Sequence, residues 1–246
     1  MRSESGTPSA TEREGSSRSS RLLIEDAKEA REREAQAVQW ERELKVEDQK
    51  AQDEALQAYL DQISRLLTDK ERPLRRARPG DNLSALARAR TLTTLTRLGG
   101  RRKRSVLQFL YEADLVIKDD VVVDLKGADL RDAHLSEADL GEADLSAATL
   151  HEASLTGADL LKADLSAANL GAADLREASL SGASLKSALG IANEKLWQQA
   201  CTLEGATMPE GQKYEEWLKT SAEAAGRMGR TKRPFVVRGG RAPPDG

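Results

Sequence analysis

Aromatic residues make up only 3% of this 246-residue chain, whereas charged residues make up 32%. This composition is atypical of one packed globular domain of such length and typical of a chain built from helices and repeats. Cys201 is the only cysteine, so the chain can form neither a disulfide framework nor a thiolate metal cluster.

Long apolar runs are also missing. No stretch approaches the roughly 18 apolar residues that a membrane-spanning helix needs. The first twenty residues are rich in serine and charge and lack the apolar segment of a signal peptide. The sequence therefore predicts a cytoplasmic protein without a transmembrane segment.

Catalytic signatures are missing as well. We find no glycine-rich phosphate loop followed by lysine, no dinucleotide fingerprint and no nucleophile elbow. The two histidines, His134 and His151, have no cysteine or second histidine at metal-ligand spacing. We expect a protein that is not an enzyme and that has no catalytic, cofactor-binding or metal site.

What the sequence does contain is a leucine at every fifth position from Leu125 to Leu185, with alanine two residues before each leucine except the first. An α-helix would rotate successive leucines by about 140°, and a straight strand would alternate their faces. A shared core therefore requires the chain to turn a corner every five residues. The predicted core residues are Leu125, Leu130, Leu135, Leu140, Leu145, Leu150, Leu155, Leu160, Leu165, Leu170, Leu175, Leu180 and Leu185.

Four such sides make a square coil of about twenty residues, in which residues twenty apart stack at about 4.8 Å. The thirteen repeats then correspond to about three coils. The tripeptide ADL starts at residues 128, 138, 143, 158, 163 and 173, and ANL starts at 168.

This pattern resembles the pentapeptide-repeat family, whose consensus is Ala, then Asp or Asn, then Leu and two variable residues. The resemblance implies a right-handed quadrilateral β-helix. The flanking segments EALQAYLDQISRLL and LEGATMPEGQKYEEWL resemble a bacterial subgroup of that family. Many members of the subgroup place transmembrane helices before the first segment, whereas this chain is charged there.

The predicted fold class is mainly β solenoid plus α: a short right-handed quadrilateral β-helix of about three coils, capped by helices, with a long charged N-terminal helix. Two cap helices are expected, from about Asn82 to Leu98 and from about Arg102 to Ala113. The predicted regions are a disordered arm at 1–19, a long charged helix or weak coiled coil at 20–71, a basic helical cap at 72–120, the repeat at 121–189, a C-terminal cap at 190–222 and a flexible basic tail at 223–246.

Opposite charges are segregated along the chain. Residues 72–104 carry eleven Lys or Arg against one acid, whereas residues 121–189 carry twelve acids against five bases. The basic segment either binds nucleic acid, anionic lipid or an acidic protein, or neutralises the chain's own acids. The candidate partner-binding residues are Arg72, Arg75, Arg76, Arg78, Arg101, Arg102, Lys103, Arg104, Asp124, Asp144 and Asp164.

The residue before each repeat leucine is usually Asp. Short acidic side chains accept hydrogen bonds from nearby backbone N–H groups, so these residues are expected to hold the corners of the coil. The alternative is an acidic surface that imitates a nucleic-acid backbone, as in family members that protect DNA gyrase. Three coils span only about 15 Å, less than half of a duplex turn of about 34 Å, which disfavours mimicry.

The predicted function is a noncatalytic protein–protein interaction or scaffold module, because a solenoid presents regular side-chain faces on a rigid support. Its partner is an unidentified protein, and the helix at 20–71 is a candidate for self-association. One alternative is a DNA-mimic regulator of gyrase or topoisomerase. A second is peripheral association with an anionic membrane through the arginine-rich segment. The sequence contains no specific nucleic-acid-binding motif.

Overall fold

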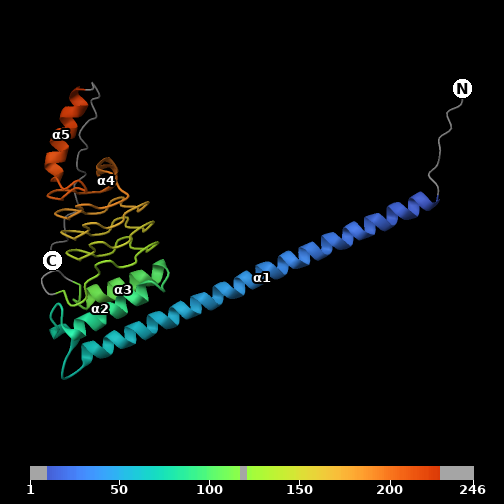
Figure 1. Cartoon of the computed structure of the whole chain (residues 1–246), viewed down its shortest axis with the longest axis horizontal. Helices are drawn as coiled ribbons and strands as arrows, with labels where there is room; N and C mark the ends of the chain where they lie inside the picture. The colour runs from blue at the N-terminus through green and yellow to red at the C-terminus, as the bar shows by residue number, and fades with distance from the viewer. Residues whose placement is uncertain (1–9, 117–120, 228–246) are drawn as a thin grey trace, which may run out of the picture. The chain divides into compact units, whose positions relative to one another are not determined.

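A computed structural model describes residues 10–116 and 121–227. The chain divides into two units, Met1–Ala51 and Gln52–Gly246. Figure 1 shows the second unit as a stack of short-sided coils, with helices at both ends of the stack. The helices are α1 (Ala10–Thr68), the 3-10 helix η1 (Leu74–Arg76), α2 (Asn82–Leu95), α3 (Gly100–Glu112), α4 (Asn193–Gln199) and α5 (Tyr214–Arg227).

Helix α1 begins at Ala10, ten residues before the helix start predicted at residue 20. The segment that follows Ala10 contains good helix formers, and its single glycine lowers helix propensity without blocking the helix. The predicted boundary of the disordered arm is therefore too late, and residues 1–9 of that arm lie outside the described residues.

The C-terminal part of α1 packs against the cap helices through an apolar stripe at helical spacing, formed by Leu56, Tyr59, Leu60, Ile63, Leu66 and Leu67. Tyr59 and Ile63 are buried. The Tyr59 hydroxyl lies 2.8 Å from the Thr91 hydroxyl of α2. Burial raises the pKa of Tyr59 to about 12. Since this phenol stays neutral, the contact is a neutral hydrogen bond inside the helical cap.

The cap helices differ from their predicted bounds. Helix α2 ends at Leu95 rather than near Leu98, and α3 begins at Gly100 rather than near Arg102. Gly99 and Gly100 follow α2, where glycine favours the end of a helix, but Gly100 is also the first residue of α3. A Cβ atom at Gly100 would overlap the backbone carbonyl oxygen of Asp132. Glycine is therefore required here because α3 approaches the first coil so closely.

Parallel β-bridges join residues twenty apart, such as Asp129 with Thr149 and Thr149 with Asn169. The Leu130 N–H donates to the Thr149 carbonyl at 2.8 Å, and the Thr149 N–H donates to the Ala128 carbonyl at 2.9 Å. Each coil thus has four five-residue sides. All thirteen repeat leucines have exposed fractions of at most 1%. The right-handed sense of the coil stays a prediction.

Each corner has the same backbone conformation. The N–H of Ala128 donates to the Leu125 carbonyl at 2.9 Å, and the corresponding bond recurs along the repeat. The residue two after each leucine has a φ between +55° and +72°, as a type II turn requires. Those residues are Gly127, Asp132, Glu137, Glu142, Ala147, Glu152, Gly157, Lys162, Ala167, Ala172, Glu177, Gly182 and Ser187.

The coil continues beyond Leu185 into the predicted C-terminal cap. Ser179 bridges to Thr202 and Ser184 to Thr207, so the spacing is 23 residues on these two sides instead of 20. The longer connection contains α4. Leu203 and Met208 are buried at the positions that leucine holds in regular repeats. A partial fourth coil therefore belongs to the cap.

Two further expectations for the C-terminal region change. A lone free cysteine is expected to behave as a small buried residue that fills space in the cap, but Cys201 is exposed. Helix α5 extends to Arg227, beyond the predicted cap boundary at residue 222. Residues 228–246 of the predicted tail lie outside the described residues.

Candidate functional site

Several cations of the basic cap form ion pairs with acidic residues of the same chain. The Arg88 Nε donates to Asp124 Oδ1 at 2.7 Å, and its Nη2 donates to the Lys126 carbonyl at 2.9 Å. Asp124 was predicted to contact a partner. Its charge is instead paired with helix α2, at the junction between the cap and the first coil.

Lys103 is only 5% exposed. Its ammonium group donates to Asp129 Oδ1 at 3.4 Å and to the Arg131 carbonyl at 3.0 Å. A buried ammonium group with two internal acceptors cannot contact a partner. The prediction of Lys103 as a partner-binding residue is therefore wrong, because its position on the inner face of α3 directs it to the coil.

Arg102 is also engaged internally. Its Nε donates to Asp53 Oδ1 at 2.7 Å, and its Nη1 donates to Gln52 Oε1 at 3.0 Å. Gln52 Oε1 accepts a further bond from the Gly99 N–H at 2.8 Å. These contacts join the start of α3 to α1, so Arg102 holds the cap together rather than forming a free surface.

The segment 72–78, which we name the arginine loop, differs from these positions. Its four arginine side chains are exposed, and none forms an ion pair or a side-chain hydrogen bond within the part of the chain that the structure describes. The four residues are Arg72, Arg75, Arg76 and Arg78.

Hydrogen bonds and one buried anchor order the arginine loop. Asp69 Oδ1 accepts from the N–H of Arg72 at 2.8 Å, and Asp81 Oδ2 accepts from the N–H of Arg78 at 2.8 Å. Leu74 in η1 is fully buried. Because both ends and the middle are held by the fold, the guanidinium groups project from a defined backbone.

The other two basic candidates lie on α3. Arg101 is exposed, and Arg104 is half-buried. Arg104 lines a groove of about 280 Å³ between α3 and the coil, together with Tyr111, Glu137 and Asp139. Burial, together with the Asp139 carboxylate, raises the pKa of Tyr111 to about 12. Arg101 and Arg104 therefore belong to the surface of α3 and are not part of the arginine loop.

The acidic candidates have a structural role in the corners. Asp144 Oδ1 accepts from the Ser146 N–H at 2.9 Å, and Asp164 Oδ1 accepts from the Ser166 N–H at 2.9 Å. Asp144 and Asp164 also stack as a bridged pair. The same bond, from the N–H two residues later, occurs at all eight Asp or Asn residues that precede a repeat leucine.

One of these corner acids is electrostatically distinct. The Arg131 guanidinium donates to both Asp129 carboxylate oxygens, at 3.0 and 2.6 Å. This hydrogen bonding, helped by the charge of Lys103, lowers the pKa of Asp129 to about 2. Asp129 therefore stays ionised at neutral pH and links the cap to the coil.

The described residues contain no cluster of His, Cys, Asp and Glu that could hold a metal ion. Among the helices of that same part of the chain, none is long and apolar enough to cross a membrane.

Comparison with known families identifies the repeat. The family model for pentapeptide repeats matches residues 124–160 and 162–188, in eight copies. The chain contains pentapeptide repeats. It is similar to the crystal structure of a pentapeptide-repeat protein from the thylakoid lumen of Arabidopsis thaliana, with 30% identity and a TM-score of 0.23. That match covers 34% of this chain and 60% of the plant chain. No curated protein matches this one.

Proposed function

We propose that this pentapeptide-repeat protein is a noncatalytic interaction module, in which the coil is the rigid support and the arginine loop contacts an anionic surface of a partner protein. One observation carries the proposal. Within one basic region, Arg88, Arg102 and Lys103 are paired with acids of the chain. The four arginines of the loop are exposed and unpaired in the described part of the chain.

This difference bears on the two explanations for the basic segment. Internal neutralisation accounts for the three paired cations, and it leaves the loop unexplained. Guanidinium groups bind carboxylates through paired hydrogen bonds, and a loop that is already ordered loses less conformational entropy on binding. Residues 72–104 contain no aromatic side chain that could stack on bases, which favours a protein over single-stranded nucleic acid.

The alternatives draw less support. A DNA mimic needs a continuous anionic surface, yet Asp124 is paired with Arg88, and Asp129 with Lys103 and Arg131. An anionic membrane would bind the same guanidinium groups of the arginine loop as an acidic protein would. The experiment below distinguishes these two partners. We also propose that the coil is right-handed and that the protein is cytoplasmic.

The test compares three full-length proteins by affinity purification from cell extract at low and moderate salt, with nuclease treatment and mass spectrometry. The first is the natural sequence, and the second replaces the four loop arginines by serine. The third is a matched control that removes four exposed cations elsewhere. Its substitutions are Arg97→Ser, Lys126→Ser, Lys186→Ser and Lys219→Ser.

We expect one discrete protein partner that resists nuclease, is lost from the loop variant and is retained by the control. Retention of that partner by the loop variant would overturn the proposal. Recovery of nucleic acid alone would also overturn it. Binding only to vesicles that contain phosphatidylserine, lost as salt rises, would replace the proposed function by peripheral membrane association.

A further inference from the structure

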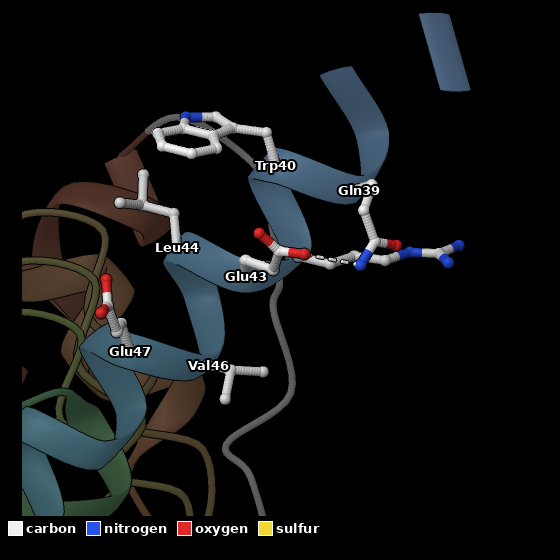
Figure 2. Close-up of a pocket in the computed structure, with 7 residues that line it drawn as sticks. Gln39, Trp40, Glu43, Leu44, Val46 and Glu47 are labelled. Atoms are coloured by element: carbon white, nitrogen blue, oxygen red, sulfur yellow. Dashed lines mark hydrogen bonds between the residues drawn. The ribbon is translucent and has the colours of Figure 1, made fainter. Parts of the chain in front are cut away.

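The N-terminal unit exposes large apolar side chains on helix α1. Trp40 is 70% exposed and Leu44 is 58% exposed. Because they are four residues apart, they lie on one face of the helix. Figure 2 shows both side chains on the same side of α1, with Val46 projecting from the other side. A surface depression on this helix is lined by Gln39, Trp40, Arg42, Glu43, Leu44, Val46 and Glu47.

The apolar face extends as a seven-residue repeat. Ala30, Ala37, Leu44 and Ala51 are spaced by seven. The positions three residues after the first three of them hold Arg33, Trp40 and Glu47. This is the spacing of a coiled-coil seam. Of these seven seam positions three are alanine and two are charged, so two copies of the seam would bury little apolar area. A partner with large side chains opposite the alanines would fill the seam better.

The charges beside the seam also disfavour a second copy. In a parallel pair, Glu43 of one helix would face Asp48 of the other, and Glu29 would face Glu34. In an antiparallel pair, the flank that holds Glu34, Glu41 and Asp48 would face itself. Like charges at these positions destabilise pairing. The two flanks carry Glu29, Glu34, Glu41, Glu43 and Asp48 against a single base, Lys50.

We infer that residues 29–51 of α1 bind an amphipathic helix of another protein that has large apolar residues along its seam and Lys or Arg on both flanks. Acidic flanks around an exposed Trp and Leu match such a partner in both charge and packing. This surface is separate from the arginine loop, so the inference does not require that loop to bind anything.

The test uses the full chain and two synthetic helical peptides of about four heptads, both with leucine along the seam. One peptide carries lysine on its flanks, and the other carries glutamate. Binding is followed by fluorescence anisotropy of labelled peptide, and the assembly state by sedimentation equilibrium. The variants are Trp40→Ala on the seam and Val38→Ala as a matched control, since Val38 is 43% exposed on another face.

We expect the lysine peptide to bind as a one-to-one complex and the glutamate peptide not to bind. Trp40→Ala should weaken binding about 30-fold, the size of a central aromatic contact. Val38→Ala should change it less than about twofold. A chain with Glu34→Lys, Glu41→Lys and Glu43→Lys should reverse the preference and bind the glutamate peptide.

Other results would overturn the inference. If both peptides bound equally well, or if Trp40→Ala and Val38→Ala lowered the affinity equally, the peptides would be binding the chain without contacting the seam. A dimer of the full chain that dissociates on Leu44→Ala would identify a second copy as the occupant. No binding of the lysine peptide at high micromolar concentration would also refute the inference, while leaving partner capture by the arginine loop intact.

Discussion

Two adjacent leucines test the packing of the coil. Leu160 is completely buried, whereas Leu161 is 41% exposed. Leu160 stacks between Leu140 and Leu180, and both of these neighbours are also buried. Its own N–H donates to the Ser179 carbonyl at 2.9 Å, which joins its coil to the next. Replacing each leucine by alanine makes the same chemical change in two different environments.

Leu160→Ala removes three carbon atoms from the core, which corresponds to about 2.4 kcal/mol of lost burial at about 0.8 kcal/mol per carbon. Hydrogen-bonded coils on both sides limit collapse around the cavity, so a cavity cost adds to this loss. We expect a total loss of about 3–5 kcal/mol in the free energy of unfolding. Leu161→Ala should lower it by less than about 1 kcal/mol, because that side chain already contacts water.

Urea unfolding, followed by circular dichroism, measures both changes on the full chain. The two variants should unfold with the same dependence on urea concentration as the natural protein, so that their midpoints are comparable. If Leu160→Ala lost no more stability than Leu161→Ala, inward packing of the repeat leucines would be refuted.

Two further perturbations test the junction between cap and coil. Gly100→Ala should destabilise the protein by about 2 kcal/mol, because the new methyl group would overlap the Asp132 carbonyl. In thermal unfolding Gly141→Ala serves as its control, since a Cβ atom there makes only ordinary contacts, and equal effects would contradict the close approach. Hydrogen bonding from Arg131 lowers the pKa of Asp129 to about 2, so its stabilisation should be present above about pH 4 and be lost as the pH falls through about 2. Asp129→Asn keeps the turn acceptor and should reduce the acid-induced loss of urea midpoint; an unchanged acid profile would exclude this contribution.

The local chemistry of the repeat makes much of the fold predictable. Neither a helix nor a straight strand can bring leucines five apart to one core, so corners are required. The Asp or Asn before eight of the leucines supplies the acceptor for its corner, as Asp144 and Asp164 do. The apolar stripe of α1 likewise predicts burial of Tyr59 and Ile63. These features follow from period and residue type, both of which are local.

The partial fourth coil was harder to predict, although its signal is present. Cys201, Thr202 and Leu203, followed by Ala206, Thr207 and Met208, repeat the spacing of five. The insertion that contains α4 shifts the stacking from 20 to 23 residues, so a search with a constant period stops at Leu185. Whether a shifted repeat stacks depends on its hydrogen bonds to the coil below, which sequence spacing alone does not provide.

The sequence by itself determines the five-residue period, the inward leucines and the large positive charge of residues 72–104. Only the tertiary structure decides how those charges are used. Lys103 pairs with Asp129, and Arg88 pairs with Asp124, because α2 and α3 lie against the first coil. In the described part of the chain, the side chains of the arginine loop form no ion pair, because the nearby Asp69 and Asp81 accept hydrogen bonds from its backbone instead. Ion pairing depends on distance in space, and the packing of distant segments sets that distance.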